Sequence, residues 1–206
     1  MDLDLGNSIV LKKFLLPEAQ WPGDVTTFDH AISAIGKGVA GAFDRFCNRL
    51  FKRSAAHVDQ FTADRAQWFV RATPLESVAT VEQKYDEATG WVAITPGLIN
   101  INEPSGRVNF GRELYDDQTL IRITYAGGYW YDSSDEQNGT MPAGATLLPA
   151  EVHLAWLTQC QHLWSIRDKT GLAVAKGPGE ASKLGDWELL MEVRRALVQY
   201  MRWQIT

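Results

Sequence analysis

The sequence predicts an α+β fold, in which helical segments at both ends of the chain flank a β-rich middle. A regular apolar stripe over residues 25–52 is typical of an amphipathic helix. Short β-branched and aromatic runs fill residues 55–125, and turn signals separate them at intervals of about 10 residues, which favours antiparallel hairpins over βαβ units. Two further helical patterns follow, over residues 149–168 and 186–203.

Residues 1–23 read as an irregular arm, because Pro17 and Pro22 exclude a long helix there. The helix at 25–52 follows, with Thr26 or Thr27 as its cap. Its apolar stripe consists of Phe28, Ile32, Ile35, Val39, Phe43, Phe46 and Leu50. Gly36, Gly38 and Gly41 interrupt this helix, and each costs about 1 kcal/mol relative to alanine. They indicate close packing against another backbone, or a kink.

The β-rich region holds short candidate strands separated by turn signals that contain Pro or Gly. These strands are expected at 56–62, 67–72, 77–85, 90–94, 98–102, 107–110 and 119–125. The pair Asp116-Asp117 is expected in a hairpin turn. The last strand ends in Gly127-Gly128, which free the backbone for a tight turn or a positive φ.

A long polar loop, 130–148, precedes the second helix, which Pro149 opens. One face of that helix is expected to carry Leu154, Leu157, Cys160 (or Gln161) and Trp164. Residues 172–185 read as a flexible link, and the apolar helix at 186–203 needs a partner surface. We therefore divide the chain into an arm (1–23), an α+β core (24–172) and a link with a C-terminal docking helix (173–206).

Composition narrows the class of protein. The chain has 206 residues, 45% of them hydrophobic, and a net charge of −5, which argues against a general nucleic-acid binder. Cys47 and Cys160 are expected to be buried free thiols. The acidic start MDLDLGNS is unlike a signal peptide, and no apolar run reaches the length of a membrane span. We therefore expect a soluble protein made in the cytoplasm, without a membrane partner.

No motif for catalysis, a cofactor or a metal is present. The sequence lacks G-x-S-x-G, the Walker lysine, G-x-G-x-x-G after a strand and C-x-x-C. On a helix, His153 and His162 would lie about 180° apart and cannot share a metal. His153 and Cys160 could share a face, but two ligands make a weak zinc site. We therefore predict that the chain is not an enzyme and has no catalytic residue, cofactor or metal ligand.

Eight tryptophans indicate contact surfaces as well as core. Trp130 and Tyr131 in the polar loop, and Trp203 near the C-terminus, lie in contexts that are not obviously core. The residues predicted to contact a partner or another subunit are Trp130, Tyr131, Trp187, Arg194, Met201 and Trp203.

Four stretches in a fixed order carry a resemblance to a known family. They are AISAIGKGVAGAFDRFCNRLF, WFVRATPLESVATVEQ, GLININEPSGRVNFG, and LIRITYAGGY followed by LPAEVHLAWLTQCQHLWSIRD. Together they span roughly residues 27–203, and the last, a Y-x-G-G-Y…P…A…R-D arrangement, is the most telling. The chain resembles the head–tail connector (adaptor, or head-completion) proteins of tailed bacteriophages.

The resemblance implies a bundle of about three to four helices packed beside a small antiparallel sheet. It also implies a non-catalytic virion protein in the neck between capsid and tail. Copies of such a protein form a ring, commonly twelvefold, under the portal protein. The ring extends the DNA channel, through which DNA passes without sequence-specific binding, and offers a docking surface to the tail or its completion (stopper) protein.

A net acidic chain suits a channel through which DNA slides, since neutralised phosphates would hold it. We expect some of the acidic residues Asp116, Asp117, Asp132, Asp135 and Glu136 to face that channel. Two alternatives remain open: a small virion-associated hydrolase that uses the acidic 130–148 loop, and a β-rich binding module.

Overall fold

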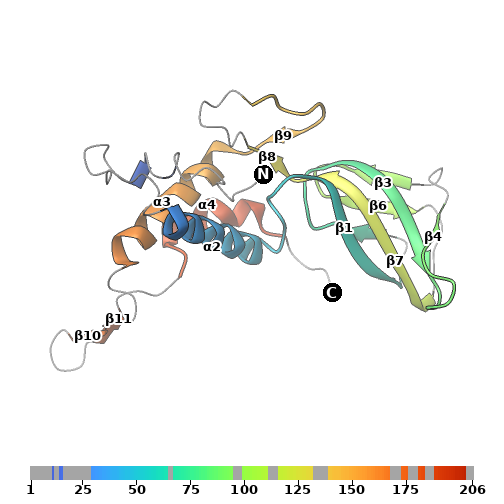
Figure 1. Ribbon diagram of the computed structural model, residues 1–206, viewed down its shortest axis with the longest axis horizontal. Coiled ribbons are helices and arrows are strands. Elements are labelled where there is room, and N and C mark those ends of the chain that lie inside the picture. Colours follow the sequence, from blue (N-terminus) through green and yellow to red (C-terminus); the bar gives the residue numbers. More distant parts are fainter. Residues whose placement is uncertain are drawn as a thin grey trace. The chain divides into compact units, whose positions relative to one another are not determined.

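The structure, a computed structural model, describes residues 11, 14–15, 29–64, 67–94, 99–110, 116–131, 139–167, 173–175, 181–183 and 188–202. These residues form α-helices and antiparallel sheets (Figure 1), which confirms the predicted α+β class. The chain divides into two compact units. The β unit is built mainly from residues 48–132 and 140–147, and the helical unit from residues 2–47 and 148–206. The predicted boundaries at residues 23 and 172 stay predictions.

Two antiparallel sheets make up most of the β unit. In the first, the strand order is β1-β7-β3-β4, with bounds β1 Ser54–Ala63, β7 Asp116–Gly127, β3 Leu75–Lys84 and β4 Val92–Ala93. In the second, the order is β2-β6-β5, with bounds β2 Gln67–Phe69, β6 Arg107–Phe110 and β5 Ile99–Asn102. Each predicted strand therefore overlaps an observed one. The prediction that Asp116-Asp117 forms a hairpin turn is wrong, because this pair begins β7.

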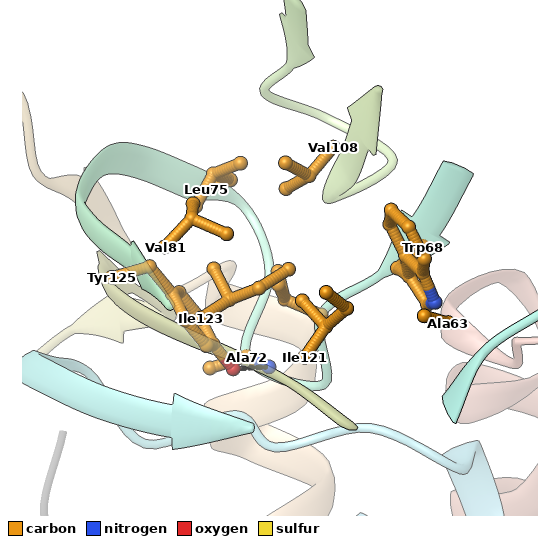
Figure 2. Packing of buried hydrophobic residues seen from close by; sticks show 10 residues of the cluster. Ala63, Trp68, Ala72, Leu75, Val81, Val108, Ile121, Ile123 and Tyr125 are labelled. Atoms are coloured by element: carbon orange, nitrogen blue, oxygen red, sulfur yellow. Dashed lines mark hydrogen bonds between the residues drawn. The ribbon is translucent and has the colours of Figure 1, made fainter. Parts of the chain in front are cut away.

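The two sheets share one hydrophobic core (Figure 2). In β7, buried Ile121, Ile123 and Tyr125 alternate with the more exposed Arg122 and Thr124, as the two-residue period of a strand requires. The second sheet contributes Trp68 and Val108. The remaining buried members are Ala63, Val70, Ala72, Leu75 and Val81.

The double glycine at the end of β7 has the backbone role that the sequence predicts. Gly128 has φ +95°, and a Cβ there would lie 2.5 Å from the Lys52 carbonyl oxygen. Its N–H donates to the Pro74 carbonyl. The chain then enters β8 (Tyr129–Trp130), which pairs in parallel with β9 (Thr146–Leu147). The predicted 130–148 loop therefore begins and ends in this short strand pair.

Three α-helices within the described residues build the helical unit: α2 (Asp29–Cys47), α3 (Ala150–Ile166) and α4 (Met191–Leu197). The 3₁₀ helix η4 (Val198–Tyr200) continues α4. α3 packs against α2 and α4, and α2 also contacts α4. The core of this unit includes Ile32, Ile35, Val39, Phe43, Val152, Trp156, Cys160, Leu163, Val193 and Leu197, together with Leu11 from the N-terminal segment.

Gly36 makes room for the largest of these side chains. A Cβ at Gly36 would lie 3.2 Å from the Trp156 ring, and the indole Nε1 donates to the Gly36 carbonyl oxygen at 3.1 Å. Of the two reasons expected for the helix glycines, close packing therefore holds at Gly36, although the neighbour is an indole ring and not a backbone.

Two helix predictions need correction. The helix predicted over 25–52 ends at Cys47, because Asn48 takes a left-handed conformation (φ 50°) that stops it. On α3, Leu154 is 61% exposed and does not belong to the buried face. The buried positions are 152, 155, 156, 159, 160, 163 and 164, a stripe with helical spacing that includes the polar residue Gln159.

In the segment expected to be a flexible link, β10 (Ala173–Ala175) pairs antiparallel with β11 (Ala181–Lys183). The flexibility of this segment stays a prediction. One helix prediction for the C-terminal segment is also corrected. The helix predicted over 186–203 begins only at Met191, since Leu190 has an extended backbone (φ −54°, ψ 150°). The expected caps at Thr26 and Thr27 lie outside the described residues.

Cys47 and Cys160 are buried free thiols, as predicted. Within the described residues, no helix is both long enough and apolar enough to cross a membrane.

Candidate assembly surfaces

The ends of the 130–148 loop carry exposed apolar side chains. Trp130 lies in β8 and is half-buried, as is Tyr131 beside it. On the returning segment, Met141 is 46% exposed and Leu147 in β9 is 58% exposed. Large apolar side chains that remain in water favour a contact surface. That Trp130 and Tyr131 contact a partner stays a prediction.

The C-terminal helix α4 has two different faces. Val193 and Leu197, four residues apart, are buried. On the other side Met191 is 61% exposed, Val198 is 53% exposed, and Arg195 is exposed as well. These three, spaced by four and three residues, form a face that we call the α4 outer face, with Val198 contributed by η4. Two of its side chains are apolar and one is basic, and the acidic Glu192 is exposed on the same helix.

The two predicted contact residues on this segment lie beside the α4 outer face. Arg194 is half-buried, and its guanidinium forms an ion pair with Glu188 at 3.0 Å. Met201 is half-buried just after η4, where its N–H donates to the Val198 carbonyl. Trp187 and Trp203 lie outside the described residues.

Gln159 fixes the start of this helix, a role that the sequence did not reveal. The side chain is 1% exposed. Its Nε2 donates to the Glu188 carbonyl at 3.1 Å, and its Oε1 accepts from the Leu190 N–H at 2.9 Å. Both bonds hold the extended segment just before Met191, so Gln159 determines where α4 begins. A glutamine inside an apolar stripe is the signal that could have indicated this role.

Replacing Gln159 with leucine is expected to lower the free energy of unfolding by about 2 kcal/mol, because the Leu190 N–H and the Glu188 carbonyl lose their partners. Hydrogen exchange at α4 should become faster. Chemical denaturation and amide exchange measure the two effects. Gln161→Leu, at an exposed position of the same helix, is the matched control and should change little. Equal effects in both variants would contradict the role given to Gln159.

The predicted channel-facing acidic residues fall in two groups. Asp116 and Asp117 are the first residues of β7, where Asp116 pairs with Ala63 of β1. Asp132, Asp135 and Glu136 lie outside the described residues. The direction in which these carboxylates face stays a prediction.

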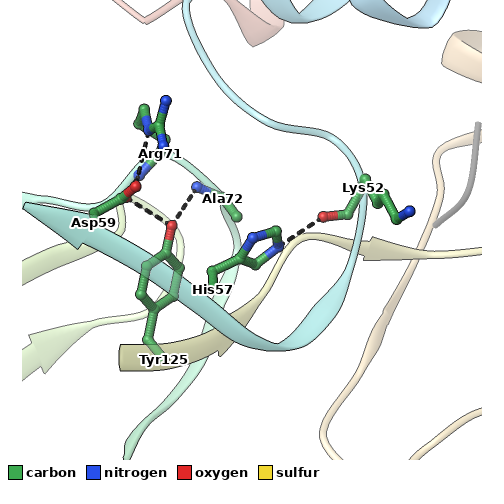
Figure 3. A network of polar contacts seen from close by, with 6 residues as sticks. All are labelled: Lys52, His57, Asp59, Arg71, Ala72 and Tyr125. Carbon is green, nitrogen blue, oxygen red and sulfur yellow. Dashed lines mark hydrogen bonds and ion pairs between the residues drawn. The ribbon is translucent and has the colours of Figure 1, made fainter. Parts of the chain in front are cut away.

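A polar network crosses the interior of the β unit (Figure 3). Asp59 of β1 is 3% exposed. Its carboxylate accepts from the Arg71 N–H at 2.7 Å, from Arg71 Nε at 2.8 Å and from the Tyr125 hydroxyl at 2.8 Å. The Tyr125 oxygen in turn accepts from the Ala72 N–H at 2.9 Å. Three separate segments of the β unit are thereby joined at one carboxylate.

The protonation states in this network favour a structural role over a catalytic or metal-binding one. Burial raises the pKa of Tyr125, so the hydroxyl stays a donor. The hydrogen bond from Arg71 to Asp59 raises the pKa of the guanidinium, which stays charged. The Asp59 oxygens are thus occupied by fixed donors, and the described residues include no group of three or more His, Cys, Asp or Glu side chains that could hold a metal. The network stabilises the β unit.

His57 lies beside this network. Its ring stacks on that of Tyr125 with 5.5 Å between centroids, and Nε2 lies 2.9 Å from the Lys52 carbonyl oxygen. Because a carbonyl only accepts, Nε2 must carry the proton. Burial lowers the pKa of His57 below its ordinary value of 6.5, although the bond to Lys52 opposes this.

The protein is expected to lose stability as the pH falls below about 6.5, because the unfolded chain binds a proton at His57 more readily than the folded chain does. His57→Gln should therefore make the free energy of unfolding less dependent on pH between about pH 7.5 and 5. Urea denaturation at several pH values measures this. Burial also lowers the pKa of His153, in the helical unit, so His153→Gln is the companion variant. An unchanged slope in His57→Gln would contradict the assignment.

Comparison with known proteins identifies solved structures that have a similar fold. No family model matches the sequence, and no curated protein is significantly similar to it. Among solved structures, a chain from the neck of an empty gene transfer agent particle, computed with C6 symmetry, is similar with a TM-score of 0.63 and 11% identity; the match covers 97% of this chain and 91% of that one. A chain of the native gene transfer agent virion is similar with a TM-score of 0.59, 11% identity and the same coverage.

A third similar chain comes from the neck of the native particle, computed with C12 symmetry. Its TM-score is 0.53 at 10% identity, over 93% of this chain and 91% of that one. The similarity thus extends over nearly the whole chain and includes both units. At such identities the similarity concerns the fold. The chain therefore shares its fold with proteins found in the neck and virion of gene transfer agent particles.

Proposed function

We propose that this protein is a structural subunit of the neck of a tailed, phage-like particle. In this proposal it is a head–tail connector that assembles into a ring under the portal protein, extends the DNA channel and provides the surface to which the tail attaches. The observation that carries the proposal is the similarity in fold, over 97% of the chain, to a neck protein of such a particle. The ordered sequence stretches that resemble connector proteins support it independently.

The chemistry of the β unit supports a non-enzymatic role. Its buried carboxylate, Asp59, is engaged by Arg71 and Tyr125 in bonds that join strands. A catalytic acid or base needs a proton-transfer position that a substrate can reach. In the helical unit, burial raises the pKa of the Cys160 thiol, which disfavours the reactive thiolate.

Two surfaces fit the contacts that a neck subunit must make. The α4 outer face (Met191, Arg195 and Val198) has two apolar side chains and one basic one, and we assign it to the portal or to a neighbouring subunit. The 130–148 loop, with Trp130 and Tyr131 at its start, is assigned to contact with a partner or with the channel. The acidic residues at the start of β7 and in the loop are proposed to face the DNA, where negative charge lets the phosphates slide.

Complementation of tail joining tests this function. Cells that make the particle but lack this chain should yield heads without tails, and the purified chain should restore tailed particles. Met191→Glu combined with Val198→Glu places charge on the α4 outer face without altering buried Val193 or Leu197. We expect this double variant to fold but to restore joining poorly.

Glu192→Gln, an exposed change on the same helix, is the matched control and should restore joining fully. Normal joining by the double variant would exclude the α4 outer face as the docking surface. Tailed particles from cells that lack the chain altogether would contradict the connector function itself.

A further inference from the structure

Strand β1 forms one edge of the four-stranded sheet, since the order is β1-β7-β3-β4. On its inner side it pairs with β7 in an unbroken register, from His57 opposite Tyr125 to Thr62 opposite Leu120. Figure 1 shows β1 running alongside β7. Within the described residues, no strand pairs with the outer side of β1.

The backbone groups on that outer side can be identified from one hydrogen bond. The Thr62 carbonyl accepts from Trp68 Nε1 at 3.0 Å, so it points away from β7. In an antiparallel pair, alternate residues direct both N–H and C=O to the same side. Because no register shift lies between His57 and Thr62, Val58 and Gln60 also point outward. Within the described part of the chain, neither has a partner for these groups, and Val58 is 48% exposed.

Between residues 58 and 62 this edge has little protection against strand addition. Proteins protect exposed edges with charged side chains, proline, bulges or a covering segment. The three residues whose backbone groups point outward, Val58, Gln60 and Thr62, all have neutral side chains, and the stretch contains no proline. The two register shifts of β1 lie at its ends, between Ser54 and His57 and between Thr62 and Ala63.

The opposite edge of the same sheet is protected. There β4 covers the end of β3, and the Val81 carbonyl accepts from Ile94. β1, in contrast, has no further strand on its outer side within the described residues. The unpaired edge indicates that β1 is covered in the working assembly, because an uncovered edge of this kind promotes aggregation.

We propose that the β1 edge is a subunit interface, at which an extended segment of a second copy of this chain adds to the sheet through Val58 and Gln60. The inference rests on the proposed ring, in which every subunit meets an identical neighbour on each flank. Such contacts are heterologous, so one flank must offer a surface that differs from the other. A neutral edge with free donors and acceptors recognises another backbone without needing a particular side chain.

Proline substitution at outward-pointing positions provides a selective test. Val58→Pro or Gln60→Pro removes an outward N–H but leaves the hydrogen bonds between β1 and β7 in place. We expect both variants to fold, and to be absent from the neck of particles made in cells that lack the native chain. Gln60→Thr keeps the backbone donor and is the matched control; it should be incorporated normally. Val58→Lys, which places charge on the edge, should be excluded like the proline variants.

Amide hydrogen exchange supplies the direct readout and does not depend on a variant folding. In the free chain, the Val58 and Gln60 amides should exchange quickly; in neck complexes released from native particles they should be protected. Normal incorporation of the proline and lysine variants, or unprotected amides in the neck, would overturn the β1 interface and leave the connector function standing. Pairing of β1 with β1 in a simple dimer, or with a different protein, would also overturn it. Absence of the native chain from the neck would instead refute the proposed function.

Discussion

Replacing Asp59 with alanine is expected to lower the free energy of unfolding of the β unit by about 3 kcal/mol. The carboxylate accepts three hydrogen bonds, two from Arg71 and one from Tyr125. Without it, the Tyr125 hydroxyl would lose its acceptor inside the core, which is costly for a buried polar group. Arg71 adds less, because its side chain is 63% exposed and can be solvated by water.

Two further variants separate the contributions to this loss. Tyr125→Phe keeps the ring and removes the hydroxyl, so it should cost about 1–2 kcal/mol, mainly through the Ala72 N–H that loses its acceptor. Glu87→Ala removes a carboxylate whose side chain is 92% exposed and should change stability by less than about 0.5 kcal/mol. Chemical denaturation followed by circular dichroism measures all three. A loss for Asp59→Ala no larger than that of Glu87→Ala would show that the network does not stabilise the fold.

Replacing Trp156 with alanine should lower the free energy of unfolding of the helical unit by about 4 kcal/mol, since it leaves a large cavity between α3 and α2. The indole is fully buried against Gly36 and donates to the Gly36 carbonyl. It also stacks on His153, with 6.2 Å between ring centroids. Among the described residues, Trp156 is the largest side chain that is fully buried.

Two controls make the Trp156 prediction specific. Trp156→Phe retains an aromatic ring but loses the Nε1 bond, and we expect an intermediate loss. Leu154→Ala truncates a side chain that is 61% exposed on the same helix, so its effect should stay below about 0.5 kcal/mol. Thermal and denaturant unfolding, monitored by helical circular dichroism, provide the comparison. A Leu154 effect as large as that of Trp156 would contradict the assignment of the buried face.

Much of the fold was predictable because periodicity and turn signals are local. The stripe Ile32, Ile35, Val39 and Phe43 determines the buried face of α2, and all four are buried. The glycines at 127 and 128 marked the end of β7 correctly, since a positive φ at Gly128 needs a residue without a Cβ.

Long-range contacts account for most of the errors. Leu154 fits an apolar stripe on α3, but the helices that pack on α3 select the neighbouring stripe with Trp156 and Gln159. The start of α4 depends on Gln159, whose partners lie about 30 residues away in sequence, beyond the reach of propensity or capping rules. Asp116 and Asp117 are residues typical of turns, yet both belong to β7, and Asp116 pairs with Ala63 of β1.

The candidate surfaces were less predictable than the fold. Tryptophan content pointed to Trp130, but the exposed side chains at Met191 and Val198 emerge only once the buried face of α4 is known. The β1 edge depends on strand order, which no local pattern in residues 54–63 encodes. The acidic residues were assigned to a channel from the resemblance to connector proteins and from the net charge, and that assignment needs the assembled ring.

Cryo-electron microscopy of the particle neck would show directly whether this chain is a connector. We expect a ring of copies of this chain between the portal and the tail, twelve copies if the resemblance to connector proteins extends to their number. The α4 outer face should lie against the portal or a neighbouring subunit, and the β1 edge against the next subunit. A neck map that contains no copy of this chain, or that shows it as an isolated monomer on the capsid or tail surface, would refute the connector function.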